Sequence, residues 1–307
     1  MAQQKILCIV GPTSSGKSAL AVELARKFNG EIISADSRQV YKGLDVGTGK
    51  ITKREMRGIR HHLLDVASPQ KRFTAHDFVV RARKAIADMA GRGKLPIVCG
   101  GTGFYIDALL GRITLPDVPA NSKLRAQFEK KTAAQLFALL KQRDPHRAKS
   151  IDPRNKRRLI RALEVAAAGG PAPNVRGFVN PYIPLWVGLQ LPPERLKQRI
   201  AIRLFARLRR GFVGQARIRE GMVVEAQRLH ARGLSYKRMR ELGLEYRSLA
   251  RFLQGKLSRA ELERELQNAI WQYARRQMTY WRRNKEIRWF KPKDKKLTVT
   301  VQRWLSS

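Results

Sequence analysis

An apolar run, Lys5-Ile-Leu-Cys-Ile-Val10, leads directly into a glycine-rich loop, Gly11-Pro-Thr-Ser-Ser-Gly16-Lys17-Ser18. The loop has the spacing GxxxxGK[ST], which is typical of a phosphate-binding turn between a buried strand and a helix. Backbone N–H groups and the N-terminus of the next helix face the anion in such a turn. Lys17 is expected to reach the terminal phosphates, and Ser18 can hold Mg²⁺. We therefore expect a di- or triphosphate to lie against Gly11, Pro12, Thr13, Ser14, Ser15, Gly16, Lys17 and Ser18.

An acidic turn follows a second apolar run. The run is Glu31-Ile-Ile-Ser-Ala35, and the turn is Asp36-Ser37-Arg38-Gln39-Val40-Tyr41. Ligands of open α/β sheets bind beyond the carboxyl ends of the strands, so Asp36 should lie beside the phosphate loop. A carboxylate there could hold Mg²⁺ or take a proton from an attacking nucleophile. Alternatively, Asp36 and Ser37 could simply cap a helix or a turn.

The charge balance points to a polyanionic partner. Lys and Arg total 63 and Asp and Glu total 24, which gives a net charge of +39. Such an imbalance costs self-repulsion, so a polyanionic partner is its natural explanation. Nucleic acid is favoured over an anionic membrane, because no single basic amphipathic anchor stands out. A basic composition shared by a whole lineage is the alternative.

Length and composition indicate a folded intracellular protein. The chain has 307 residues, of which 43% are hydrophobic. Cys8 and Cys99 each sit in an apolar run and are interpreted as small core residues in a reducing compartment. No apolar stretch approaches the ~20 residues of a membrane span, and no signal-peptide pattern is present. We expect a cytoplasmic location and no membrane contact.

Alternating short apolar runs and helical patterns over the first 112 or so residues predict a parallel sheet built from βαβ units. Strands are expected near 5–10, 31–35, 62–66 and 95–99, with a helix near 75–92. The last of these strands opens into Gly100-Gly101-Thr102-Gly103-Phe104-Tyr105. Two glycines allow a close backbone approach to a ligand, and Thr102 offers a hydroxyl toward the edge that carries Asp36. The motif could also be only a tight strand-to-helix turn.

The chain changes character at Leu115-Pro-Asp-Val-Pro-Ala-Asn121, after which amphipathic helical patterns dominate. We expect a helical insertion at 115–176, within an α/β domain formed by 1–114 and 177–307. The densest basic run of the insertion is Arg154-Asn-Lys-Arg-Arg-Leu-Ile-Arg161, which the overall charge favours as a nucleic-acid contact over a solvated helix face.

The C-terminal part is expected to be mainly helical. A core strand is expected at 186–191, helices at 193–209, 219–232, 246–254 and 259–283, and a short terminal strand at 297–301. The longest helix carries a stripe interpreted as core-facing: Leu262, Leu266, Ile270, Tyr273, Gln277 and Tyr280. The predicted fold class is therefore α/β, with a P-loop NTPase-like parallel sheet core, a mostly helical insertion and a helical C-terminal part.

The type of reaction follows from what is missing after the 95–99 strand. A kinase of this class usually has an acidic residue there, whereas this strand ends in glycines. Asp65, after His61-His-Leu-Leu64, is a poor substitute. A group transfer with diphosphate as the leaving group fits better, because the loop, Lys17 and Mg²⁺ would then stabilise departing charge.

The chain resembles the tRNA dimethylallyltransferase family from about residue 5 to residue 290. The motifs that carry this resemblance are GPTSSGKS at 11–18, SADSRQVYKGLDVGTGK at 34–50, HHLLD at 61–65, GGTGFY at 100–105, LPDVPAN at 115–121, DPRNKRRLIRALEV at 152–165, ELGLEYRSL at 241–249 and QYARRQMTYWRR at 272–283. Any one of these motifs is modest evidence, but the ordered set is highly specific.

The resemblance implies a reaction and the residues that perform it. Family members transfer the dimethylallyl group of dimethylallyl diphosphate to N6 of adenosine 37 in the anticodon stem-loop of tRNA. It implies that Lys17 is the main diphosphate cation and that Ser18 holds Mg²⁺. Asp36 matches the general base, Thr102 a transition-state-stabilising threonine, and Arg203 an arginine that assists the diphosphate. The positions that match tRNA contacts are Asp36, Ser37, Arg38, Gln39, Thr102, Arg125, Arg157, Arg158, Leu159, Ile160 and Arg161.

One segment departs from the family pattern. Arg207 and Leu208 replace a Met-Leu pair, and about ten residues, 211–220, then precede a second family-like stretch that begins at Gly221. The segment is interpreted as an insertion or a local duplication beside the active site.

A single active centre needs no partner subunit, so we expect a monomer. The alternatives are a P-loop small-molecule or nucleoside kinase, and an RNA-binding protein that uses nucleotide as a switch.

Overall fold

The chain forms two compact units. A computed structural model describes residues 3–116, 118–119, 121–169, 182–209, 211–213, 216–218 and 221–307. The first unit is Met1–Leu110 with Asn180–Ser307, and the second is Gly111–Val179. The domain boundary predicted at 176 and 177 lies outside the described residues.

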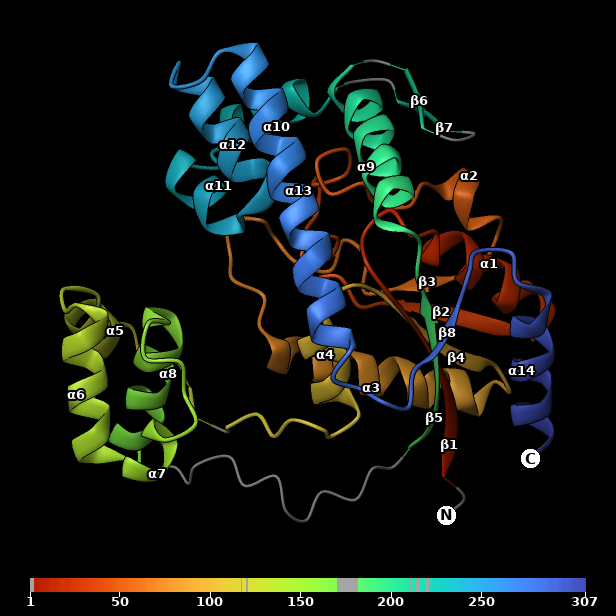
Figure 1. Cartoon of the computed structure of the whole chain (residues 1–307), viewed down its shortest axis with the longest axis horizontal. Helices are drawn as coiled ribbons and strands as arrows, with labels where there is room; N and C mark the ends of the chain where they lie inside the picture. Colours follow the sequence, from red (N-terminus) through yellow and green to blue (C-terminus); the bar gives the residue numbers. More distant parts are fainter. Residues whose placement is uncertain are drawn as a thin grey trace. The chain divides into compact units, whose positions relative to one another are not determined.

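A six-stranded parallel sheet forms the centre of the first unit (Figure 1). Its strands are β1 (Gln4–Val10), β2 (Gly30–Ser34), β3 (His61–His62), β4 (Leu95–Cys99), β5 (Tyr182–Leu189) and β8 (Arg288–Phe290), in the spatial order β3-β2-β4-β1-β5-β8. All five pairings are parallel, so the carboxyl ends of the strands meet at one edge. The predicted α/β class is confirmed, and β1, β2 and β4 end where the candidate site residues begin.

Ten helices of the described residues belong to this unit. They are α1 (Lys17–Lys27), α2 (Lys53–Met56), α3 (Ala75–Gly91), α4 (Gly103–Leu109), α9 (Pro193–Leu208), α10 (Met222–Ala231), α11 (Tyr236–Leu242), α12 (Leu244–Leu253), α13 (Arg259–Trp281) and α14 (Lys295–Ser306). The long helices start at strong local signals. Thr74 and Asp77 form a capping box on α3, and Ser258 and Glu261 form one on α13.

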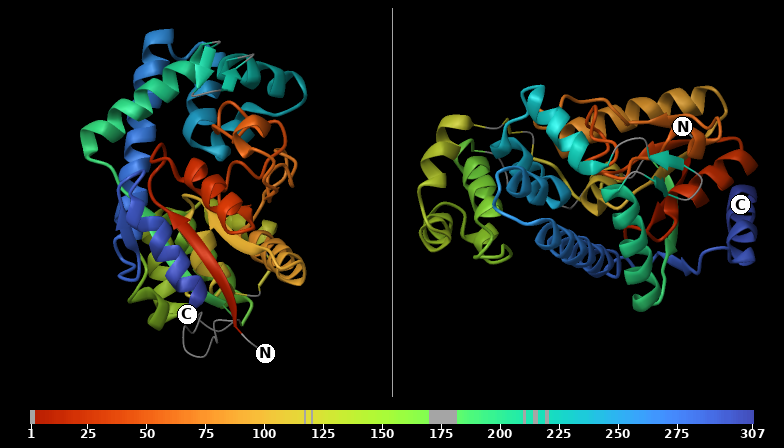
Figure 2. Two further views of the ribbon diagram at one scale, coloured as in Figure 1. Left: turned by 90° about the vertical axis from the view of Figure 1, so that its right-hand side faces the viewer. Right: turned by 90° about the horizontal axis from the view of Figure 1, so that it is seen from above.

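Two hydrophobic clusters of described residues contribute to the core of this unit. Leu7 and Ile9 of β1 pack with α1 and α14 in the first cluster. The second cluster joins α9 to α13 and the loop that follows β2, with Val40 and Leu44 among its buried residues. Figures 1 and 2 show α13 running from the α10–α12 group toward α4, which brings its C-terminal half to the edge of the sheet.

The second unit has a small core of its own. Its described helices are α5 (Ser122–Glu129), α6 (Ala133–Arg143), α7 (Pro145–Ala148) and α8 (Lys156–Ala167). Leu136 and Leu140 of α6 and Leu159 and Leu163 of α8 are fully buried against one another. Helical spacing at i and i+4 on both helices therefore builds this core.

Within the 211–220 segment that departs from the family pattern, the described residues form an antiparallel hairpin. The hairpin consists of β6 (Gly211–Val213) and β7 (Ala216–Ile218), which pair with Gly211 opposite Ile218. It follows α9 directly and precedes α10.

The strand predicted at 297–301 is wrong. Residues 295–306 form α14, which begins at the N-cap Asp294. Leu297 and Val301 are buried one helical turn apart, while Val299 is 47% exposed. Alternating β-branched residues are typical of a strand and led to that prediction. The segment is instead a helix whose buried i, i+4 pair, Leu297 and Val301, packs in the cluster that contains β1.

Further differences from the sequence-based prediction concern two strands and a helix. The strand predicted near 62–66 is shorter than expected, because Leu63 and Asp65 have positive φ angles of 65° and 56° that end the extended backbone. Strand β8 and helix α11 were not predicted.

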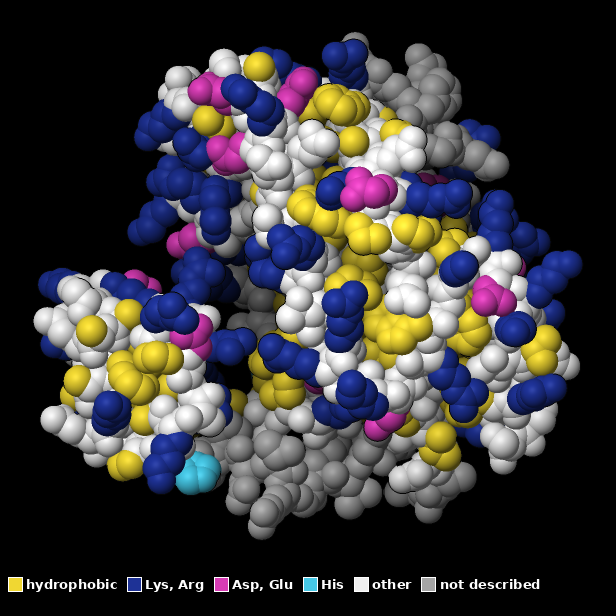
Figure 3. Space-filling model, viewed as in Figure 1, with side chains coloured by type: hydrophobic (Ala, Val, Ile, Leu, Met, Phe, Trp, Pro, Cys, Tyr) yellow, Lys and Arg dark blue, Asp and Glu magenta, His cyan; other side chains and the backbone are white. Residues whose placement is uncertain are grey.

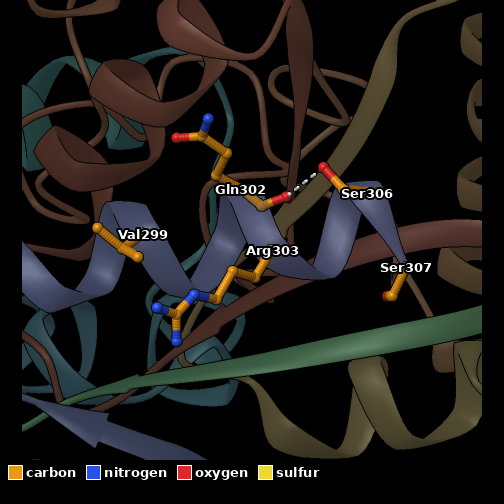
Figure 4. Close-up of a pocket in the computed structure, with 5 residues that line it drawn as sticks. All are labelled: Val299, Gln302, Arg303, Ser306 and Ser307. Atoms are coloured by element: carbon orange, nitrogen blue, oxygen red, sulfur yellow. Dashed lines mark hydrogen bonds between the residues drawn. The ribbon is translucent and has the colours of Figure 1, made fainter.

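No described helix combines the length and the apolarity that crossing a bilayer requires. A shallow hollow on α14 (Figure 4) involves none of the predicted site residues and is lined by Val299, Gln302, Arg303, Ser306 and Ser307.

Candidate active site

The glycine-rich loop between β1 and α1 has a backbone that requires glycine at two points. Gly11 has φ of +136°, and a Cβ added there would lie 2.5 Å from the carbonyl oxygen of Leu189. Gly16 has φ of +103° and is the N-cap of α1. The loop therefore leads directly into the N-terminus of α1, which is suited to binding an anion. Ser15 is fully buried, and its hydroxyl has no hydrogen-bond partner among the described residues, so an anion in the loop would supply one.

Lys17 lies over this loop. Its Nζ donates a hydrogen bond to the carbonyl oxygen of Pro12 at 2.6 Å. Burial lowers the pKa of Lys17 to about 8, and the charge of Asp36 opposes part of that decrease. The ammonium is therefore a poorly solvated cation that gains from the arrival of an anionic group.

The loops after β2 and β4 bind one another. The backbone N–H of Thr102 donates to the carbonyl oxygen of Ala35 at 3.1 Å, and the N–H of Ser37 donates to Thr102 Oγ1 at 3.1 Å. Asp36 Oδ1 accepts hydrogen bonds from the N–H groups of Arg38 (2.8 Å) and Gln39 (3.3 Å). The turn-capping alternative for Asp36 is thus real for one oxygen. Its Oδ2 accepts no hydrogen bond within the described part of the chain, which leaves it available to take a proton.

The glycines after β4 are required by close packing. A Cβ on Gly100 would lie 2.1 Å from the carbonyl oxygen of Ala35, and one on Gly101 would lie 2.0 Å from Gln277 Nε2. Gln277, predicted as part of a core-facing stripe, is 5% exposed, but its amide is polar and paired. Its Oε1 accepts from the N–H of Thr13 (2.8 Å), and its Nε2 donates to the carbonyl oxygen of Gly101 (3.0 Å). Sequence periodicity indicated the burial of Gln277 but not this bridge.

Arginines one turn apart on α9 border the phosphate loop. Arg199 donates to the carbonyl oxygen of Ser15 at 3.4 Å, and Arg203 lies 3.5 Å from Ser14 Oγ. Burial lowers the pKa of Arg203 to about 10, and the charge of Arg207 adds to that decrease. The structure therefore brings the predicted Arg203 to the loop. Sequence reasoning missed Arg199, although its i, i+4 spacing from Arg203 was a usable signal.

Arg207 faces a different loop. It donates to the carbonyl oxygen of Gly47 at 2.9 Å and pairs with Glu245 at 3.2 Å. The arginine that departs from the family pattern is thus neutralised and holds the 45–50 segment in place.

The 45–50 segment also rests on a buried carboxylate that the sequence reasoning missed. Glu225 is fully buried and accepts hydrogen bonds from three successive backbone N–H groups, those of Asp45, Val46 and Gly47. The Tyr246 hydroxyl donates to it as well, at 2.6 Å. Burial raises the pKa of Glu225 despite these donors. Only an acid within the apolar stripe of α10 could have indicated this anchor.

The residues of the second unit that match tRNA contacts fall into two groups. Arg157 and Arg158 are exposed. Leu159 and Ile160 are buried in the core of this unit, so their side chains cannot face an RNA. The prediction that they contact tRNA is therefore corrected for the side chains of these two residues.

Arg125 and Arg161 of the second unit share one buried carboxylate. Arg125 binds both oxygens of Glu164, at 2.6 and 2.8 Å, and Arg161 contacts the same carboxylate at 3.3 Å. Hydrogen bonding from Arg125 and its neighbours keeps the pKa of Glu164 low in spite of burial. Both guanidiniums thus already have a structural role.

A magnesium ion would depend on the substrate for most of its ligands. The described residues include no group of three or more His, Cys, Asp or Glu side chains that could hold a metal. Ser18 is exposed next to Lys17 at the start of α1. Mg²⁺ usually keeps several waters and binds through one or two protein oxygens together with phosphate oxygens, so Ser18 beside a bound diphosphate fits the ion.

Comparison with known proteins identifies close relatives. A family model described as IPP transferase matches residues 39–284. The tRNA dimethylallyltransferase of Oceanobacillus iheyensis is 36% identical over 297 residues, which cover 94% of this chain and 91% of that protein.

Two solved structures are also similar. The tRNA isopentenylpyrophosphate transferase of Bacillus halodurans is 33% identical and superposes with a TM-score of 0.71, over 99% of this chain and 96% of that one. A eukaryotic dimethylallyltransferase described as acting on tRNA is 25% identical and superposes with a TM-score of 0.77, over 98% of this chain and 78% of that one.

Proposed function

This chain belongs to the IPP transferase family, and from that premise we propose that it transfers the dimethylallyl group of dimethylallyl diphosphate to N6 of adenosine 37 in tRNA. The observation that carries the proposal is the meeting of three loops at one edge of the sheet. The loop after β1 is suited to a diphosphate, the charge of Asp36 in the loop after β2 acts on Lys17, and Thr102 in the loop after β4 is hydrogen-bonded to the loop of Asp36.

The proposed reaction assigns a part to each of these groups. N6 of the adenosine attacks the allylic carbon, the bond from that carbon to the diphosphate oxygen breaks, and the N6 proton passes to Asp36. Lys17, Arg199 and Arg203 would stabilise the negative charge that develops on the departing diphosphate. Mg²⁺ held by Ser18 and the phosphates would neutralise further charge.

The reaction on a base needs that base outside its stack. Adenosine would be flipped from the anticodon loop at a cost of a few kcal/mol, which basic contacts to the RNA backbone offset. Lys and Arg side chains are abundant on the face shown in Figure 3.

We assign tRNA contacts to Ser37, Arg38, Gln39, Thr102, Arg125, Arg157, Arg158 and Arg161, and tRNA binding to the 115–176 insertion. We further propose that the chain acts as a monomer, and in the cytoplasm, where tRNA is modified.

A kinase is the second candidate function, and the end of β4 argues against it. Cys99 is followed by Gly100, Gly101 and Thr102, so no carboxylate stands where a kinase of this class holds its metal.

Mass spectrometry of an unmodified anticodon stem-loop tests the proposal. The RNA is incubated with the protein, Mg²⁺ and dimethylallyl diphosphate, and we expect one dimethylallyl group on the adenosine at position 37. Asp36→Ala should abolish the product, whereas Asp88→Ala, which removes an exposed carboxylate of α3, should not. Stem-loop binding without product would contradict the proposal, and the kinase would then be tested with ATP.

A further inference from the structure

Gln277 connects two loops that belong to different strands. Its amide carbonyl accepts from Thr13 in the loop after β1, and its amide nitrogen donates to Gly101 in the loop after β4. Both polar ends of the side chain are used, and only 5% of the residue is exposed. A carboxamide can accept at one end and donate at the other, and it stays neutral at every pH near neutrality.

The helix that carries Gln277 is firmly placed. Tyr280, nearly one turn further along α13, packs so closely on Gly103 that a Cβ there would lie 2.2 Å from its ring. Trp281 is 1% exposed and packs against Trp186 of β5, with ring centroids 6.1 Å apart. Movement of Gln277 relative to the sheet is therefore restricted at its own end of the helix.

A continuous path of contacts leads from this bridge to the candidate base. Gln277 holds Gly101, Thr102 follows Gly101, and the Thr102 hydroxyl accepts from Ser37 next to Asp36. At its other end the path begins in the phosphate loop at Thr13. The phosphate loop and Asp36, which must act on the leaving group and on the attacking nucleophile, are thus joined beyond the ends of the strands through the side chains of Gln277 and Thr102.

We propose that Gln277 is a positioning residue, which sets the distance between the bound diphosphate and the Thr102–Asp36 pair; this inference rests on the proposed transfer reaction. In-line attack on an allylic carbon requires the leaving group and the base to be held at a fixed distance and orientation. A misplacement of about 1 Å can cost about 100-fold in rate. Gln277 itself touches no reacting atom.

Substitution by a side chain of similar size without hydrogen bonds tests the proposal. Gln277→Met should lower kcat by about 10-fold or more, because the loops after β1 and β4 are no longer held at a fixed distance from each other. The KM for dimethylallyl diphosphate should change by less than about 2-fold, since the phosphate loop keeps its own amides and Lys17. Gln272→Met makes the same change at an exposed position of the same helix and should leave both constants unchanged.

A pH profile separates positioning from a general loss of stability. In Gln277→Glu the protonated carboxyl can still accept from Thr13 and donate to Gly101, whereas the carboxylate repels the Gly101 carbonyl oxygen. Burial raises the pKa of such a carboxyl. The ratio of variant to wild-type kcat should therefore be near one at about pH 5.5 and should fall by about 10-fold or more by about pH 8. Gln272→Glu should give a flat ratio.

The outcomes distinguish a failure of the positioning role of Gln277 from a failure of the proposed transfer reaction. A pH-independent ratio for Gln277→Glu, or an unchanged kcat for Gln277→Met in folded protein, would overturn the positioning role. If the wild-type protein formed no prenylated RNA, the proposed function would fail before the variants are compared.

Discussion

At the scale of single residues, the phosphate loop carries a cation whose charge depends on pH near neutrality. Burial lowers the pKa of Lys17 to about 8, so the free protein loses this charge as the pH rises through that value. The KM for dimethylallyl diphosphate should therefore increase by about 10-fold between about pH 7 and about pH 9. Steady-state kinetics at saturating stem-loop RNA measure it. Lys17→Arg should bind more weakly but should show a flat KM profile over that range, because a guanidinium stays charged; a flat wild-type profile would contradict the assignment.

A second residue-scale prediction concerns the stability of the protein near the N-terminal end of β2. Hydrogen bonds from Arg92 lower the pKa of the nearly buried Glu31 to about 2, and His62 adds a further contact at 2.7 Å. Because the folded-state pKa lies below the unfolded value, the stabilisation is present above about pH 5 and is lost as the pH falls toward 2.

Glu31→Gln should consequently lower the free energy of unfolding by about 2–3 kcal/mol at neutral pH. The difference from wild type should shrink progressively between about pH 5 and about pH 3, as measured by urea denaturation. Glu23→Gln, at an exposed position of α1, is the control and should change stability by less than about 0.5 kcal/mol at any of these pH values. An equal loss at all pH values would show that the ion pair is not the cause.

At the scale of secondary-structure elements, local signals predicted most of the sheet and of the long helices, and tertiary packing explains the rest. The strands before the phosphate loop and before Asp36 were predictable because apolar runs end in glycine or acidic turns. The β8 strand has only three residues, Arg288–Phe290, and derives its identity from pairing with β5. Likewise, periodicity predicts that Gln277 is buried but gives no indication of which loops its amide joins, since those loops lie far away in the chain.

The C-terminal element offers a direct test of helix against strand. In a strand, residues 297, 299 and 301 would share one face, whereas in α14 only Leu297 and Val301 face the core. Leu297→Ala should therefore cost about 2–4 kcal/mol of unfolding free energy. Val299→Ala, at a position 47% exposed, should cost less than about 0.5 kcal/mol. Comparable losses at both positions in urea denaturation would favour the strand.

At the scale of the whole molecule, the net charge of +39 should appear in the salt dependence of RNA binding. Each phosphate contact releases counterions, so the logarithm of affinity falls with the logarithm of salt concentration at about 0.7–0.9 per contact. Arg157→Ala with Arg158→Ala should weaken stem-loop binding and should reduce this slope by about 1.4–1.8. Titrations by fluorescence anisotropy at several salt concentrations measure both quantities.

The matched control removes the same number of charges elsewhere. Lys295→Ala with Lys296→Ala takes two exposed cations from α14, in the part of the first unit that carries no candidate site residue. If the RNA contacts Arg157 and Arg158 but not α14, this pair should leave the slope unchanged, because charges more than about 10 Å from the RNA are screened at moderate salt. Equal effects of the two pairs would mean that the basic character of the chain acts as a general field. A slope near zero in the wild-type protein would instead favour the alternative that a basic composition is simply shared by the lineage.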